Sequence, residues 1–153
     1  MLQFMQLIWA VVHGTEKASK RMKGTLGITG PQRLVLRVVG LLPGVSAGEL
    51  AAILHVHPST LTGVLRRLAR QRLIVRLVDD RDRRRAILHL TARGRTINRA
   101  NRGTVEEAIS VALAGVSARD RAATRRVLER LSYHLEHVPA ARGRRRAGGR
   151  RHA

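Results

Sequence analysis

Residues 58–70 read Pro58-Ser-Thr-Leu-Thr-Gly-Val-Leu-Arg-Arg-Leu-Ala-Arg70 and have the periodicity of an amphipathic helix. At about 100° per residue the apolar side chains form one stripe, which comprises Leu61, Val64, Leu65 and Leu68. The remaining surface carries small and hydroxyl residues first and arginines later, namely Ser59, Thr60, Thr62, Gly63, Arg66, Arg67 and Arg70. A solvated helix face usually mixes Glu with Arg, but no acid occurs between Pro58 and Val78. Such a face suits the DNA major groove, where small polar side chains approach base edges and Arg pairs with guanine.

Two capping boxes precede this segment. Thr29-Gly-Pro-Gln32 predicts the start of one helix and Ser46-Ala-Gly-Glu49 the start of another, while Pro43-Gly44 ends the first of them. Downstream, the apolar runs Leu73–Val78 and Arg85–Leu90 predict a β-hairpin. Three short helices followed by a hairpin are the winged helix-turn-helix arrangement.

The hairpin tip, residues 79–84, is highly charged. Arg81, Arg83, Arg84 and Arg85 repel one another unless a polyanion approaches, and an inserted arginine suits the negative potential of a narrow minor groove. We expect Asp82 to hold a nearby guanidinium in a bidentate pair. The candidate DNA-binding residues of the tip are therefore Arg81, Asp82, Arg83 and Arg84. The alternative is a charged, solvated hairpin.

The segments on either side of the winged helix-turn-helix domain, called the reader below, predict dimerisation. The first helix, Met1 to about Met22, is apolar around most of its circumference, so a partner subunit is its expected cover; Gly24, Gly27 and Gly30 then break the pattern. Two further helices are expected after Thr91, the last opening at Ser117-Ala-Arg-Asp120. The predicted division is an N-terminal dimerisation helix at 1–28, a winged helix-turn-helix domain at 29–91 (recognition helix about 58–71, wing about 73–90), C-terminal dimerisation helices at 92–137, and a basic disordered tail at 138–153.

The composition favours a polyanionic partner. The 153 residues include 30 Lys+Arg against 10 Asp+Glu, a formal net charge of +20. The alternative is a basic solvated surface in an Arg-rich proteome. Aromatic residues are few, which favours double-stranded DNA over single strands that need stacking platforms. The chain has no cysteine, and its apolar opening at Met1–Val12 is too short to span a bilayer, so we expect a cytoplasmic, nucleoid-associated protein without a membrane partner.

The motifs together resemble the MarR (multiple antibiotic resistance regulator) family. Asp79-Asp-Arg-Asp-Arg-Arg84, followed by Leu90-Thr-Ala-Arg-Gly94, resembles the D-x-R-D-x-R…L-T-x-x-G wing signature of that family. The segments that begin at Thr29, Ser46 and Pro58 also fall where the family has its pre-reader and recognition helices. The resemblance covers about residues 5–137. Two departures are Asp80, where Pro is frequent, and His57, where Ser often caps the recognition helix.

The resemblance implies a two-fold dimer built from the first and last helices. Each subunit would place a recognition helix in the major groove and a wing arginine, here Arg84, in the minor groove. It also implies a pocket for a small, often phenolic, effector between the dimer helices and the reader. Trp9 and His13 lie one turn apart and could line such a pocket, although dimer packing is the more ordinary role of such a pair.

The favoured function is a homodimeric repressor on a palindromic operator that a small molecule can release. A low-specificity architectural (nucleoid-type) DNA-binding protein is the alternative. An enzyme is not favoured: Gly44-Val-Ser-Ala-Gly48 spells the nucleophile-elbow motif but follows a helix, so Ser46 is better explained as a cap. The pairs His55/His57 and His134/His137 lack a third ligand at a suitable spacing, and neither a metal nor another cofactor is predicted.

Overall fold

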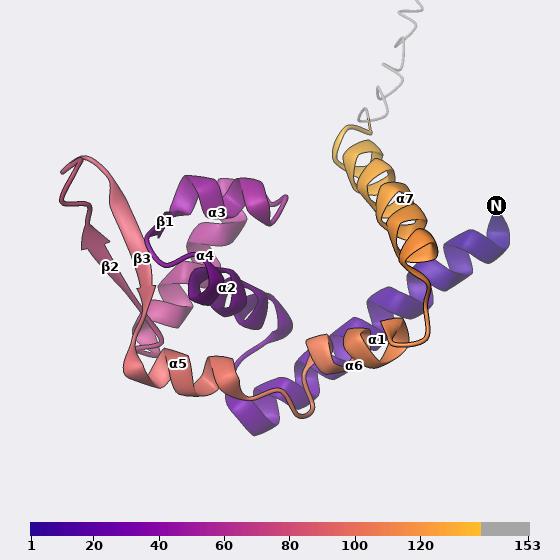
Figure 1. Cartoon of the computed structure of the whole chain (residues 1–153), viewed down its shortest axis with the longest axis horizontal. Coiled ribbons are helices and arrows are strands. Elements are labelled where there is room, and N and C mark those ends of the chain that lie inside the picture. Colours follow the sequence, from indigo (N-terminus) through magenta and orange to yellow (C-terminus); the bar gives the residue numbers. More distant parts are fainter. Residues whose placement is uncertain (139–153) are drawn as a thin grey trace, which may run out of the picture. The chain divides into compact units, whose positions relative to one another are not determined.

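The computed structural model describes residues 1–138 and confirms the mainly helical fold with a hairpin (Figure 1). The chain forms two compact units, one spanning Met1–Ala112 and the other starting at Leu113. The elements are α1 (Leu2–Leu26), α2 (Gly30–Leu41), β1 (Val45–Ser46), α3 (Ala47–Ile53), α4 (Pro58–Arg70), β2 (Ile74–Val78), β3 (Ala86–Leu90), α5 (Ala92–Arg99), α6 (Val105–Leu113) and α7 (Ala118–Glu136). The assignment of the outer helices to dimerisation stays a prediction.

Both predicted capping boxes are present. At α2, Gln32 Oε1 accepts the backbone N–H of Thr29 at 2.9 Å while the Thr29 hydroxyl accepts the N–H of Gln32. At α3, Glu49 Oε2 accepts the N–H of Ser46 at 2.8 Å, and the Ser46 hydroxyl accepts the N–H of Glu49 at 3.3 Å. Each box satisfies two backbone donors that a helix start would otherwise leave without partners. Ser46 is therefore a helix cap.

The hairpin gains a third strand that was not predicted from the sequence. β2 pairs antiparallel with β3 from Ile74↔Leu90 to Val78↔Ala86, and β1 pairs with the other edge of β3. Two residues are too few to show an alternating pattern, which explains the omission. The third strand joins the start of α3 to the middle of β3.

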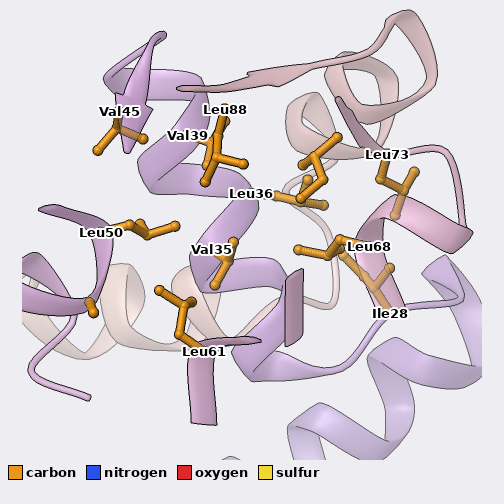
Figure 2. Close-up of a cluster of buried hydrophobic side chains, with 12 residues drawn as sticks. Ile28, Val35, Leu36, Val39, Val45, Leu50, Leu61, Leu68, Leu73 and Leu88 are labelled. Carbon is orange, nitrogen blue, oxygen red and sulfur yellow. The ribbon is translucent and has the colours of Figure 1, made fainter. Parts of the chain in front are cut away.

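An apolar core holds the three central helices and the sheet together. Figure 2 shows side chains of α2 projecting among those of α3, α4 and the strands. The main members are Val35, Leu36, Val39, Leu50, Leu61, Leu68, Leu73 and Leu88. Leu61 and Leu68 dock the predicted apolar stripe of α4, so the opposite surface of that helix faces solvent.

Gly94 allows α5 to approach the root of the hairpin. A Cβ at this position would lie 1.9 Å from the carbonyl oxygen of Leu73, too close for any side chain. Thr91, the N-cap of α5, accepts the N–H of Gly94 at 3.0 Å and donates its hydroxyl to the carbonyl of Arg72 at 2.6 Å. The glycine of the Leu90–Gly94 motif is thus needed for packing.

A buried arginine joins α2 to α5 and α6. The Arg33 guanidinium donates to the carbonyls of Ile97 and Ala100, both at 2.6 Å, and to Glu106 Oε1 at 2.8 Å. Its side chain is 1% exposed, so all these bonds form away from bulk water. Arg37 lies one turn further on and reaches the same Glu106 oxygen only at 3.9 Å.

Two helix boundaries were predicted wrongly. α1 continues through Gly24 to Leu26 and ends where Gly27 adopts a left-handed conformation with φ of 72°. The helix predicted after Thr91 is divided into α5 and α6, because Gly103 has φ of 71° and Thr104 begins a new turn, its hydroxyl accepting the N–H of Glu107. A single glycine is tolerated inside a helix, so its presence alone does not predict a stop.

The apolar side chains of the first half of α1 are largely exposed. Phe4 is 48%, Leu7 66% and Val11 68% accessible to solvent. In the part of the chain that the structure describes, no helix combines the length and the apolarity needed to cross a membrane. A contiguous exposed apolar surface of this kind marks a site of interaction.

Candidate nucleic-acid interface

α4 presents the predicted reading residues on its outer surface. Ser59, Thr60, Thr62, Arg66, Arg67 and Arg70 are exposed and Gly63 is half-buried. Because the apolar stripe is fixed in the core, these side chains share a rigid support. The helix carries three arginines and no acid. Its arginines can therefore donate hydrogen bonds to phosphates and to guanine edges, because no carboxylate on the same helix competes for them.

The start of α4 has an uncommon cap. His57 is the N-cap, and its Nδ1 accepts the backbone N–H of Ser59 at 3.3 Å while lying 2.8 Å from the Ser59 hydroxyl. Thr62 donates its hydroxyl to the carbonyl of Pro58 at 2.9 Å. The Thr62 oxygen then presents lone pairs outward, and these can accept from the amino groups of cytosine or adenine.

The hairpin tip is organised by aspartates that bind the backbone. Asp79 Oδ1 accepts the N–H of Arg81 at 3.0 Å, and Asp82 Oδ1 accepts the N–H of Arg84 at 2.9 Å. The expectation that Asp82 holds a guanidinium is therefore wrong for the described residues. An aspartate side chain reaches the N–H two residues ahead with little strain, so this local turn forms instead. Arg81, Asp82, Arg83 and Arg84 are all exposed.

Arg85 does not join the exposed arginines of the tip. Its Nη2 lies 2.7 Å and 2.6 Å from the two carboxylate oxygens of Glu49, and its Nε lies 3.8 Å from Asp79. The hydrogen bonds from Ser46, together with the weaker effect of Arg85, lower the pKa of Glu49. The lowered pKa keeps this carboxylate ionised, and hence paired with the Arg85 guanidinium, down to a lower pH.

A groove of about 400 Å³ separates α4 from the sheet. Thr62 and Arg66 line it from α4, and Arg76 lines it from β2. Arg76 was not among the residues predicted from the sequence; strand alternation places it on the same face of the sheet as the buried Ile74, the face that lines this groove beside α4. Arg76 is exposed and extends the basic surface of α4 toward the hairpin.

Trp9 and His13 are in contact on α1. Their ring centroids lie 4.8 Å apart, and His13 Nδ1 lies 3.2 Å from the Trp9 carbonyl. A groove of about 630 Å³ runs along the next turns of the helix and is lined by Val11, Val12, Thr15, Glu16, Ser19, Lys20 and Pro31. Neither Trp9 nor His13 lines this groove.

The histidine pairs form no metal centre within residues 1–138. No group of three metal-ligating side chains gathers there. His57 is used as a cap, and His137 stacks on Tyr133 with centroids 4.3 Å apart. Residues 139–153, which are all but the first residue of the predicted basic tail at 138–153, lie outside the described residues.

Comparison with known proteins places this geometry in one family. The sequence matches the MarR family model over residues 26–85. It is 33% identical over 106 residues to the HTH-type transcriptional repressor Rv2887 of Mycobacterium tuberculosis, covering 69% of this chain and 76% of the relative. The fold matches MepR of S. aureus in a DNA complex (TM-score 0.70, 22% identity, 86% of this chain and 97% of MepR). It also matches PcaV of Streptomyces coelicolor in complex with its natural ligand (TM-score 0.63, 22% identity, 87% and 89%). The chain belongs to the MarR family of winged helix-turn-helix transcriptional regulators.

Proposed function

We propose that this protein is a homodimeric transcriptional repressor that binds a roughly palindromic operator in double-stranded DNA. α4 enters the major groove, and the hairpin carries Arg84 into the neighbouring minor groove. The observation that carries this proposal is the acid-free outer surface of α4, where Arg66, Arg67 and Arg70 are exposed above a packed core. A surface of uniformly positive charge on a rigid helix suits a polyanion of fixed shape.

The aspartates of the hairpin tip support the same function. Asp79 and Asp82 each have one carboxylate oxygen engaged by a backbone N–H, which disperses part of their charge into the turn. The tip can then approach phosphates with the arginines outward. Insertion of Arg84 into the minor groove is stabilised by the negative electrostatic potential that a narrow groove concentrates, and it requires little recognition of individual bases.

The apolar surface of α1 supports a dimer. Exposed Phe4, Leu7 and Val11 need cover, and a second copy of the chain supplies the same surface in reverse. A two-fold dimer presents two copies of α4 and hence predicts an operator with inverted half-sites. Light scattering at micromolar concentration tests this step: the dimer has twice the mass of the chain, and a stable monomer contradicts both the dimer and the symmetric operator.

An effector that releases DNA is the next part of the proposal. Trp9 and His13 lie in contact beside the groove on α1, and the similar protein PcaV forms a complex with its natural ligand. We favour a phenolic molecule because it can stack on the indole and donate to the imidazole. Trp9 is the single tryptophan, so its fluorescence reports on this position. Phenolic acids that quench Trp9 and release DNA in parallel support the effector, and quenching without release contradicts it.

A footprint on genomic DNA tests the main proposal against its alternative. The net charge of +20 also suits an architectural protein that coats DNA with little preference. A repressor protects one short symmetric site and leaves the flanking DNA open, whereas an architectural protein extends its protection with concentration. Either protein would act at the nucleoid in the cytoplasm, so location does not separate them.

A further inference from the structure

The contact between Arg85 and Glu49 connects two parts of the reader. Arg85 directly follows the hairpin tip, and its guanidinium turns back to the start of α3, where Nη2 lies 2.6 Å from Glu49 Oε2. The same carboxylate oxygen accepts the N–H and the hydroxyl of Ser46, both at 2.8 Å. Glu49 therefore holds the helix cap and the hairpin at one point.

This tie acts at the point where the sheet ends. The last ladder pair is Val78↔Ala86, and one further bond between the strands, from the N–H of Asp79 to the carbonyl of Arg85 at 2.9 Å, leaves residues 80–84 beyond the sheet. Within the tip, the bonds from Asp79 and Asp82 set the local turn but do not reach another element. The Arg85 side chain connects the tip to α3, which packs against α4.

We propose that Arg85 is a positioning residue of the DNA interface and does not itself contact DNA. Its pairing with Glu49 fixes the direction of the hairpin relative to α3 and α4, so that Arg84 and the reading helix reach their grooves together. The inference rests on the proposed DNA-binding function and names a residue that orients that site. It also removes Arg85 from the set of arginines available to phosphates.

The rival explanation treats Arg85 as one more phosphate-binding arginine, and Glu49 distinguishes the two. If Glu49 is only an acid near the interface, its neutralisation lowers repulsion and strengthens DNA binding. If Glu49 holds the hairpin through Arg85, its neutralisation weakens binding. Glu49→Gln is the suitable change because Gln also serves in a capping box, so the start of α3 is kept.

The first measurement is a binding titration on one operator, selected with the wild-type protein, over a range of salt concentrations. We expect Glu49→Gln and Arg85→Ala each to weaken binding severalfold, and the double variant to bind no more weakly than either single one. The salt slope is the decrease in the logarithm of the binding constant per unit increase in the logarithm of the salt concentration. It stays at the wild-type value in all three variants, whereas removal of a phosphate contact lowers its magnitude by about 0.9. Tighter or unchanged binding by Glu49→Gln, or a slope lowered by about 0.9 in Arg85→Ala, overturns the proposal.

The second measurement uses the free dimer and separates this inference from the proposed function. Amide exchange at Asp79, Arg84 and Arg85, whose N–H groups are bonded within the tip, should become severalfold faster in Glu49→Gln and Arg85→Ala than in the wild type. The amide of Leu68 in the core should be unaffected. If the exchange rises but the wild type binds no duplex, the proposed function fails and the positioning of the hairpin stands. Unchanged exchange at all three amides overturns the positioning role whatever the DNA result.

Discussion

Replacement of Arg33 by alanine should be one of the most destabilising single changes in this chain. The guanidinium is the donor for the carbonyl oxygens of Ile97 and Ala100 and for one oxygen of Glu106. Alanine fills none of these positions, so the Ala100 carbonyl and the Glu106 oxygen lose this donor at the junction of α5 and α6, while the Ile97 carbonyl keeps only the N–H of Ala100 at 3.2 Å. The junction has no alternative donor of equal reach, because Arg37 approaches Glu106 only at 3.9 Å.

The magnitude follows from burial. Removal of one partner of a buried ion pair costs about 3–5 kcal/mol, and a buried carbonyl left without a donor costs about 1–3 kcal/mol. The Ile97 carbonyl keeps the N–H of Ala100 as a donor, and the Glu106 side chain is 32% exposed even though its Oε2 is buried, so the lower total is appropriate. We therefore expect Arg33→Ala to lower the free energy of unfolding by about 3–5 kcal/mol, which corresponds to a decrease of roughly 6–20 °C in Tm for a chain of this size.

Thermal unfolding at one fixed protein concentration measures this effect, because an associating protein has a concentration-dependent Tm. Arg37→Ala is the matched control on the same helix and beside the same carboxylate. Arg37 is 37% exposed, so its removal should cost less than about 1 kcal/mol. If Arg33→Ala lowers Tm no more than Arg37→Ala does, the buried hydrogen bonds of Arg33 do not stabilise the junction of α5 and α6.

Four other changes test three separate parts of the structure. Gly94→Ala should prevent α5 from packing and abolish cooperative unfolding in a thermal melt, because its Cβ would lie 1.9 Å from a backbone oxygen; Gly48→Ala, with open space around its Cβ, should fold normally. Arg84→Ala should weaken operator binding while largely keeping the base preference. Asp82→Ala should weaken binding more mildly, because the turn that presents Arg84 is disrupted. Tighter binding by Asp82→Ala in the same titration contradicts this role of the turn. Deletion of residues 142–153 should weaken binding to all duplexes equally and lower the salt slope by about 0.9 for each phosphate that the tail no longer neutralises, and a changed sequence preference after selection contradicts this.

Features that depend on short spacings could be predicted from the sequence. The capping boxes at Thr29 and Ser46 involve residues three positions apart, so the pattern and the contact coincide. The apolar stripe of α4 follows from helix geometry alone, and burial of Leu61 and Leu68 confirms it. The residues on the outer surface of α4 could therefore be predicted from the sequence alone.

Contacts between distant residues could not be predicted in this way. Arg33 binds groups 64 and 67 residues further along the chain, and in the sequence it is one basic residue of many. The pairing of Arg85 with Glu49 spans 36 residues and moves an arginine from the predicted interface to a supporting position. Asp82 was assigned to a guanidinium because the chemistry allowed it, but the nearer backbone N–H of Arg84 competes more effectively.

Parallel selection of bound sequences from a random duplex pool, with the wild type and Arg66→Ala, tests the central claim that α4 reads a symmetric operator. The wild type should enrich a short inverted repeat. Arg66→Ala should lose the preference at one position, and at the symmetry-related position of the other half-site, because a bidentate Arg–guanine pair is worth about 1–3 kcal/mol of discrimination. Enrichment of no sequence by the wild type, or of the same repeat by both proteins, would contradict reading of the operator by this face of α4.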